Sequence, residues 1–256
     1  MRQDTAISDK PVSIFPDRPV TLFHQCLADS LYPDVNTSVE KIMGRLGVPV
    51  RRPADQTCCG QPAFNAGYRK EAATAAARFI EIFGDAETIV CPSGSCVNMV
   101  RHHYPLLFQH DPKYYGRAID VGKRIFELTE FLVDELHVTD MGATFAGKVT
   151  YHDSCHLSRG LGIRSQPRKL IQHVKSAVLI EMKDSDRCCG FGGSFFLKYR
   201  DISKAMAADK VRNIADTGAD VVVGCDMGCL MRIQKQLHRI GSGIRAMHIA
   251  QLLSMT

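Results

Sequence analysis

The ten cysteines of this chain form two copies of one pattern, and no cysteine is left over. Each copy has a lone cysteine, then a Cys-Cys-Gly triplet, then two cysteines a few residues apart. The first copy consists of Cys26, Cys58, Cys59, Cys91 and Cys96, and the second of Cys155, Cys188, Cys189, Cys225 and Cys229. Corresponding cysteines lie 129–134 residues apart, a register that thiols placed only for packing would not keep. The repeat predicts two half-domains, each with a five-thiol set that is most economically explained by metal.

The size and charge of the chain narrow the classes of function. Its 256 residues fit one large domain or two of about 100–130 residues. The net charge is +5 without a run of five basic residues, which gives no support for nucleic-acid binding. The first 18 residues lack the apolar segment of a secretory signal, and no stretch approaches the roughly 18 apolar residues of a membrane span. We therefore expect a cytoplasmic protein, whose thiols serve metal ligation or redox chemistry rather than disulfides.

The hydrophobic pattern predicts alternating strands and helices. Apolar strands are expected over 20–23, 88–90, 148–151, 177–182 and 220–223, and helices over 39–46, 68–83, 123–136, 168–174, 201–215 and 231–237. This alternation indicates an α/β protein of two pseudo-symmetric domains with parallel sheets and crossover helices. We expect a flexible arm over 1–18, a first cysteine-rich domain with its joining helix over 19–141, a linker over 141–147 and a second domain over 148–256.

Four of the cysteines follow the predicted strands closely, namely Cys26, Cys91, Cys155 and Cys225. In parallel α/β sheets, functional groups gather beyond the carboxyl ends of the strands. The Cys-Cys-Gly triplets lie in loops before helices. We therefore expect the thiols of each half to converge at one end of that half's own sheet.

The vicinal cysteines favour a multi-iron cluster over a single metal ion. Neighbouring thiols point in different directions and chelate one tetrahedral ion poorly, whereas each can reach a different iron of a cluster. Gly60 and Gly190 allow the backbone to come close to sulfur. Zinc stays open as an alternative, because the spacings of Cys91 with Cys96 and of Cys225 with Cys229 suit it. Disulfides and inert buried thiols explain the duplicated pattern less well.

Longer motifs resemble a known family. The cysteine-rich CCG domain is similar to the segments 26–60 and 155–190, and it occurs duplicated in the cysteine-rich subunit of heterodisulfide reductase, in the iron–sulfur subunit of glycolate oxidase and in lactate utilization protein A. The resemblance to the lactate utilization protein A family is the greatest. It is carried by the segments 58–68 (CCGQPAFNAGY), 92–96 (PSGSC), 188–195 (CCGFGGSF), 226–230 (DMGCL) and 247–250 (MHIA).

The resemblance implies two iron–sulfur clusters, of 4Fe–4S type. The first would be ligated by Cys26, Cys58, Cys59 and Cys96, and the second by Cys155, Cys188, Cys189 and Cys229. Cys91 and Cys225 depart from the spacing in the related families, so they are either additional ligands or bystanders. We favour bystanders, because the motifs that supply Cys96 and Cys229 are complete without them.

The same resemblance implies an electron-transfer role in a complex that oxidises L-lactate to pyruvate. The chain would be an oxidoreductase subunit acting with a ferredoxin-like iron–sulfur protein and a third small subunit. A heterodisulfide-reductase-like subunit, a glycolate-oxidase iron–sulfur subunit and a non-catalytic zinc scaffold stay open as alternatives. The sequence identifies no catalytic residue, and it leaves open whether this chain binds lactate itself.

Several charged or titratable residues lie near the cysteines in the sequence. The lone cysteines are flanked by His24, His152 and His156, for which an ordinary polar role in a loop is favoured over proton transfer. Four basic residues near the second set would either offset cluster charge and hold a carboxylate, or be ordinary surface charges: Arg159, Arg164, Arg187 and Lys198.

Overall fold

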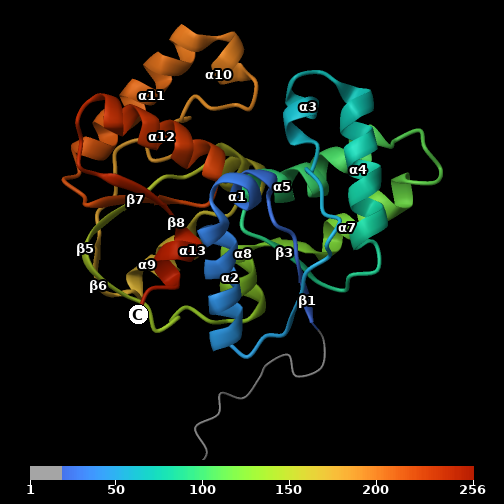
Figure 1. The fold of residues 1–256 in the computed structure, drawn as a ribbon, viewed down its shortest axis with the longest axis horizontal. Helices are drawn as coiled ribbons and strands as arrows, with labels where there is room; N and C mark the ends of the chain where they lie inside the picture. Colours follow the sequence, from blue (N-terminus) through green and yellow to red (C-terminus); the bar gives the residue numbers. More distant parts are fainter. Residues whose placement is uncertain (1–18) are drawn as a thin grey trace, which may run out of the picture.

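The computed structural model describes residues 19–256, so the predicted arm over 1–18 lies outside the described residues (Figure 1). Two four-stranded sheets form the frame, and every neighbouring pair of strands is parallel. The first sheet has the order β2-β1-β3-β4, with β1 Val20–Leu22, β2 Val50–Arg51, β3 Ile89–Cys91 and β4 Ile125–Glu127. The second has the order β6-β5-β7-β8, with β5 Thr144–Tyr151, β6 Lys175–Leu179, β7 Val221–Gly224 and β8 Arg245–His248.

The two halves repeat one topology, which confirms the α/β fold predicted from the sequence. Their first strands leave the sheet in the same way: the N–H of Phe23 donates to the carbonyl of Val90 (2.9 Å), and the N–H of His152 donates to that of Val223 (2.8 Å). Phe23 and His152 precede the lone cysteines Cys26 and Cys155 by three residues each. The cysteine register therefore reflects a register of the whole fold.

Helices connect the strands on both faces of the sheets. Those of the first half are α1 Cys26–Leu31, α2 Pro33–Arg45, α3 Gln61–Asn65, α4 Arg69–Phe83, α5 Gly94–Asn98, η1 Met99–His103, α6 Tyr104–Leu107, α7 Tyr115–Arg124, α8 Leu128–Glu130 and η2 Phe131–Glu135. Those of the second half are η3 His156–Gly160, α9 Ser165–Gln172, α10 Phe195–Lys198, α11 Arg200–Ala215, α12 Met227–Arg239 and α13 Ile249–Leu253. The predicted helices 68–83 and 201–215 are confirmed as α4 and α11, and those predicted over 39–46, 168–174 and 231–237 overlap α2, α9 and α12.

Three short strands were not predicted. The helix predicted over 123–136 is wrong at its start, because residues 125–127 form β4 and the helical segments α8 and η2 begin only afterwards. The strands β2 and β8 were also missed. These three strands are two to four residues long and contain charged residues, so they lack the mostly apolar run that marked β1, β3 and β7, and the sheet decides them. The strand β5 begins at Thr144, inside the predicted linker, and its first residues pair with β6.

The hydrophobic core is shared by the two halves. One buried cluster contains Val20 and Leu22 of the first sheet together with Val149 and Val221 of the second. The crossover helix α2 packs against the C-terminal helix α13 (Figure 1), and α9 packs against α8 in the corresponding way. The guanidinium of Arg45 donates to the carbonyls of Met141 (3.3 Å), Leu253 (3.2 Å) and Ser254 (2.6 Å). The packing thus fixes one half against the other.

Within residues 19–256 there is no helix whose length and apolar character would allow it to cross a membrane.

Candidate metal centre

Both thiol sets open into one cavity of about 320 Å³ between the two halves. The elements that surround it meet at the centre of Figure 1, where α1 and α5 lie below α3 and α10. Eight of the ten cysteines line the cavity: Cys26, Cys58, Cys59, Cys96, Cys155, Cys188, Cys189 and Cys229. These are the eight residues that the family resemblance assigns to the clusters. The sequence placed each set at the end of its own sheet, and the structure shows that the two ends face each other.

The positions of the thiols follow from the local structure. Cys26 is the first residue of α1, Cys155 directly precedes η3, Cys96 lies in α5, and Cys229 lies in the first turn of α12. Helix N-termini stabilise negative charge through their unpaired N–H groups. The pKa is lowered for Cys96 and Cys229, whereas hydrogen bonds to Cys58 and Cys188 raise the pKa of Cys26 and Cys155. The remaining thiols come from the two Cys-Cys-Gly loops.

The glycine of each Cys-Cys-Gly loop is required by the backbone. Gly60 and Gly190 have φ angles of +83° and +80°, values that strongly favour glycine. A Cβ on Gly60 would lie 3.0 Å from the carbonyl oxygen of Ala72, and one on Gly190 would lie 2.7 Å from that of Ser203. The loops are therefore pressed against α4 and α11. This brings the N–H groups of Gly60 and Gly190 to 3.4 Å from the sulfurs of Cys58 and Cys188.

The first thiol set shares negative charge between neighbouring sulfurs. Hydrogen bonds from Cys26 and Cys59 lower the pKa of Cys58 to about 3. The Sγ of Cys59 donates to the Sγ of Cys96 at 3.5 Å, and this bond, with one from Cys91, lowers the pKa of Cys96. Thiolates are the form that binds metal, so this arrangement prepares the set for metal ligation.

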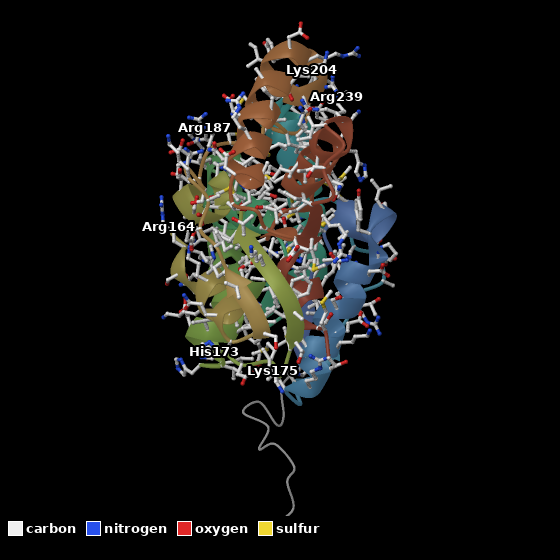
Figure 2. The ribbon with its side chains drawn as sticks, turned by 90° about the vertical axis from the view of Figure 1, so that its left-hand side faces the viewer. Arg164, His173, Lys175, Arg187, Lys204 and Arg239 are labelled. Atoms are coloured by element: carbon white, nitrogen blue, oxygen red, sulfur yellow. The ribbon has the colours of Figure 1, made fainter. Side chains whose placement is uncertain are left out.

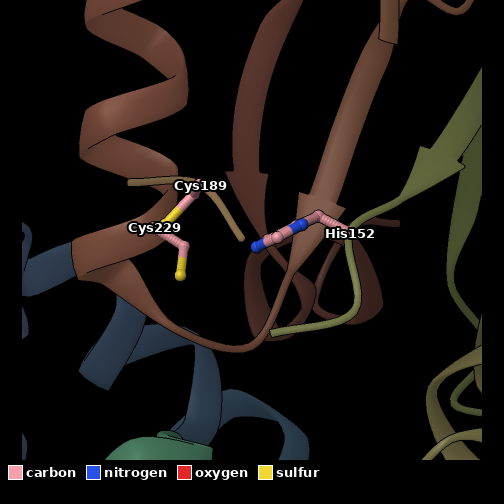
Figure 3. Close-up of side chains that lie close together, drawn as sticks. All are labelled: His152, Cys189 and Cys229. Atoms are coloured by element: carbon pink, nitrogen blue, oxygen red, sulfur yellow. The ribbon is translucent and has the colours of Figure 1, made fainter. Parts of the chain in front are cut away.

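The second thiol set has the same arrangement and an additional imidazole. Hydrogen bonds from Cys155 and Cys189 lower the pKa of Cys188 to about 2. A hydrogen bond from Cys189, with a further contribution from His152, lowers the pKa of Cys229 to about 7. The donor atoms of His152, Cys189 and Cys229 all lie within 4.8 Å of one another, and the ring of His152 is turned toward the two sulfurs (Figure 3).

The two remaining cysteines do not line the cavity. Cys91 and Cys225 are fully buried, and burial raises the pKa of each thiol. Cys91 still contacts a cavity thiol, since its hydrogen bond with Cys96 also raises its pKa. Cys225 instead lies 3.3 Å from the hydroxyl of Tyr151. That both are bystanders stays a prediction, and the structure makes Cys225 the more remote of the two.

A buried carboxylate joins the two halves beside the cavity, and the sequence analysis did not single it out. Asp226 Oδ1 accepts hydrogen bonds from Ser93 Oγ (2.9 Å) and from the N–H of Ser95 (3.0 Å), both in the first half. Its Oδ2 accepts one from Ser154 Oγ in the second half. Asp226 and Ser93 are the N-cap residues of α12 and α5, which occupy equivalent places in the repeat. A comparison of the two copies, position by position, would have found this residue.

The basic residues near the second set lie away from the cavity. Arg159, Arg164, Arg187 and Lys198 are all exposed, and Figure 2 shows Arg164 and Arg187 extending outward at the surface. Arg187 pairs with Asp184 and Asp209. The structure therefore favours their interpretation as surface charges. No arginine or lysine is found among the described residues that line the cavity.

The three flanking histidines have different surroundings. His24 is mostly buried near Asp29 and Glu40, outside the cavity lining. His156 lines the cavity, with its Nδ1 3.7 Å from the sulfur of Cys155. His152 is fully buried beside Cys189 and Cys229.

The donor set fits iron–sulfur clusters. All ten cysteines are free thiols, and each cavity set combines a lone thiol, a vicinal pair and a thiol at a helix N-terminus. Thiolates from several loops are the usual ligands of such clusters. A single zinc ion could use all four cavity thiols of a set only by binding both members of its vicinal pair, and neighbouring thiols chelate one tetrahedral ion poorly.

Comparisons with known proteins show which family the chain resembles. The family of the cysteine-rich domain, CCG, matches residues 20–101 and 149–234. Lactate utilization protein A from Exiguobacterium sp. is 47% identical over 237 residues, which is 92% of this chain and 96% of the relative. The protein of the same name from Oceanobacillus iheyensis is 44% identical over 235 residues (92% and 96%), and that from Bacillus subtilis is 45% identical over 235 residues (92% and 98%).

The fold also occurs in a solved structure. A hypothetical protein from Helicobacter pylori superposes with a TM-score of 0.63 over 93% of this chain at 11% sequence identity. The chain spans about half (48%) of that protein. At this identity the likeness concerns the fold alone.

Proposed function

The chain belongs to the lactate utilization protein A family, and from this premise we propose that it is the iron–sulfur electron-transfer subunit of a complex that oxidises L-lactate to pyruvate. One observation carries the proposal: eight free thiols, in two equivalent sets, face a single cavity between the halves. Cys26, Cys58, Cys59 and Cys96 hold the first cluster, and Cys155, Cys188, Cys189 and Cys229 the second. The 4Fe–4S type is part of the proposal.

The clusters supply one-electron carriers, and the protein supplies the environment that holds them. Hydrogen bonds within each thiol set keep thiolates available for iron. The N–H groups of Gly60 and Gly190 donate to ligand sulfur, an interaction that tunes the reduction potential of a cluster. Apolar side chains at the cavity, Leu27 and Phe191 among them, limit the access of water.

Electron transfer is better supported than binding of lactate by this chain. A 2-hydroxy acid carries a carboxylate, which proteins commonly hold with a bidentate guanidinium or an ammonium group. The described lining residues of the cavity include neither. We therefore place the lactate site on a partner. The partners in this proposal are a ferredoxin-like iron–sulfur protein and a third small subunit, in the cytoplasm, where thiols stay reduced.

Metal analysis of anaerobically purified protein tests the proposal. Iron, acid-labile sulfide and zinc are measured in the wild type, in Cys58→Ser and in Cys188→Ser. We expect iron and sulfide for two clusters in the wild type, and the loss of one cluster in each variant. Cys225→Ser is the matched control, because this thiol is buried outside the cavity and its loss should leave both clusters in place.

Stoichiometric zinc without sulfide in the wild type would refute cluster binding. The metabolic role is tested separately, by mixing the loaded protein with its two partners and following the oxidation of lactate and of glycolate. Oxidation of lactate that requires this chain, and that falls in both Cys→Ser variants, is the expected result. A preference for glycolate would move the chain to the glycolate-oxidising alternative.

A further inference from the structure

The two thiol sites differ at two buried positions that the fold makes equivalent. His152 in the second half occupies the place of Phe23 in the first, since both follow the first strand and donate their N–H to the neighbouring strand in the same way. Lys210 occupies the place of Phe79. The contacts of the Cys-Cys-Gly glycines show this equivalence, because Gly60 lies against Ala72 of α4 and Gly190 lies against Ser203 of α11. Phe79 follows Ala72 by seven residues, and Lys210 follows Ser203 by the same number.

In the first half these positions are apolar and satisfied. Phe23 packs its ring against that of Phe79, with centroids 4.9 Å apart at 86°, and against that of Phe83, with centroids 5.4 Å apart at 76°. All three side chains are at most 1% exposed. They belong to the same buried cluster as Cys59 and Cys96. Phe23 and Phe79 carry no atom that could bind a metal, so the first site offers only sulfur ligands where the second site has His152.

In the second half the same positions are polar, and one is unsatisfied. The ammonium of Lys210 donates to the carbonyls of Asp184 (2.9 Å) and Ser185 (3.0 Å). His152 is 1% exposed and helps to lower the pKa of the Cys229 thiol, yet neither of its ring nitrogens makes a hydrogen bond of ordinary geometry to a described residue. Buried polar groups without a partner are rare in folded proteins and call for an explanation such as a bound ion. Figure 3 shows where the ring points, which is toward Cys189 and Cys229.

The distances suit ligands of one cluster. The ligand atoms of His152, Cys189 and Cys229 lie within 4.8 Å of one another. Because metal–ligand bonds are roughly 2.0–2.3 Å long, a small side-chain shift would bring the imidazole onto an iron of a cluster that would be held beside these two thiols. The corresponding fifth thiol of this half, Cys225, is held elsewhere by Tyr151.

We propose that His152 supplies an imidazole nitrogen to the iron–sulfur cluster of the second half, so that the two clusters of this chain are chemically inequivalent. The inference rests on the proposed function, because it needs a cluster in the second thiol set. Every protein ligand of the first cluster is then a thiolate, whereas in the second cluster the imidazole would take the place of one of the two thiolates beside it, Cys189 or Cys229, so that each iron keeps one protein ligand. Histidine ligands raise the reduction potential of iron–sulfur centres relative to thiolate ligands, since they bring no negative charge. The second cluster is therefore the more easily reduced of the two.

Pulsed EPR on the full chain tests the proposal directly. The protein is produced with 15N-labelled histidine, purified anaerobically with iron and sulfide quantified, and poised at potentials where each cluster is paramagnetic. A directly bonded imidazole gives a strong nitrogen hyperfine coupling at one cluster only. The variant His152→Phe copies the first half, and we expect it to lose this coupling and to shift the midpoint potential of that cluster downward.

A second histidine provides the matched control. His156 also lies at the second set, 3.7 Å from the sulfur of Cys155. We expect His156→Phe to keep the strong coupling. Retention of the coupling in His152→Phe, or its loss in His156→Phe alone, would overturn the assignment.

Two further results keep the proposal separate from its premise. If His152→Phe does not fold, the labelled wild type still decides, because a loaded protein without a strong nitrogen coupling at either cluster overturns the proposal. The less disruptive variant His152→Gln then gives the change in potential. A wild type that binds no iron and sulfide refutes the proposed function instead.

Discussion

The substitution Gly190→Ala should destabilise the protein more than an ordinary glycine substitution and should empty the second cluster site. Gly190 has φ of +80°. A Cβ there would lie 2.7 Å from the carbonyl oxygen of Ser203 and 3.1 Å from the Cβ of Met206. Both contacts belong to α11, whose backbone cannot yield locally without breaking its own hydrogen bonds. The loop that carries Cys188 and Cys189 would therefore move away from the helix.

The magnitude follows from two separate costs. A non-glycine residue in the left-handed region costs about 1–2 kcal/mol. Overpacking against a fixed neighbour adds about 1–3 kcal/mol. Gly218→Ala is the matched control, because Gly218 has φ of +62° but no atom lies within 4 Å of the position that a Cβ would take there. It should bear only the first cost. The difference corresponds to roughly 2–12 °C in melting temperature for a chain of this size.

Thermal unfolding of the reduced, cluster-free variants measures this difference, with urea unfolding as a second measure. We expect Gly190→Ala to melt below Gly218→Ala and, after reconstitution, to bind iron and sulfide for one cluster only. Equal melting temperatures would show that the contact with α11 does not constrain the loop. Two intact clusters in Gly190→Ala would show that the loop geometry is not needed for ligation.

Three further predictions concern buried charge and the contact between the halves. Burial raises the pKa of Glu127 to about 8 from 4.5, so its contribution to stability is complete below about pH 4.5 and is lost as the pH rises to about 8. The unfolding free energy of Glu127→Gln should therefore rise relative to that of wild type by on the order of 3–4 kcal/mol between pH 4.5 and pH 8, as measured by urea unfolding of the cluster-free protein. A difference that stays constant across this range would contradict the burial of Glu127. Asp226→Ala leaves hydrogen-bond donors of both halves unpaired and should lower the unfolding free energy by about 2–4 kcal/mol. Asp226→Asn keeps an acceptor oxygen and should lower it less, so equal urea midpoints for the two variants would refute this bridge. Arg45→Ala should lower the unfolding free energy by about 2–4 kcal/mol by removing three hydrogen bonds, two to the second half and one to Met141. An unchanged urea midpoint would mean that these hydrogen bonds do not help to hold the halves together.

The duplicated thiol pattern was sufficient to predict much of the molecule. Thiols that bind one metal centre must keep a fixed distance in sequence from the strands that carry them. The equal positions of Cys26 and Cys155 after the first strand of each half therefore indicate that the whole fold is repeated. The long helix α4 was also predictable, because its buried residues follow a helical period over about four turns. The helix α11 was predicted correctly although its apolar stripe is weak, since Ile202 is exposed and Ser203 and Lys210 are buried. The two Cys-Cys-Gly glycines could be expected to approach sulfur, since only glycine permits the backbone geometry of such a loop.

The short strands depended on the tertiary structure. Residues 125–127 carry no periodic signal of their own, and they form β4 only because β3 offers a free edge beside them. The same holds for β8 beside β7. The equally short strands β1 and β3 were predicted from their buried apolar runs, whereas β4 and β8 contain charged residues and are defined by hydrogen bonds from a distant segment of the chain.

The joining of the two thiol sets into one cavity was likewise decided by packing between the halves. The sequence determines that two equivalent sets exist and which residue types compose them. It does not determine that α2 packs on α13, that Asp226 ties Ser93 to Ser154, or that the buried ring of His152 is left facing Cys189 and Cys229 without a partner among the described residues. These features arise from contacts between residues far apart in the chain, whose geometry is fixed only when the shared core is complete.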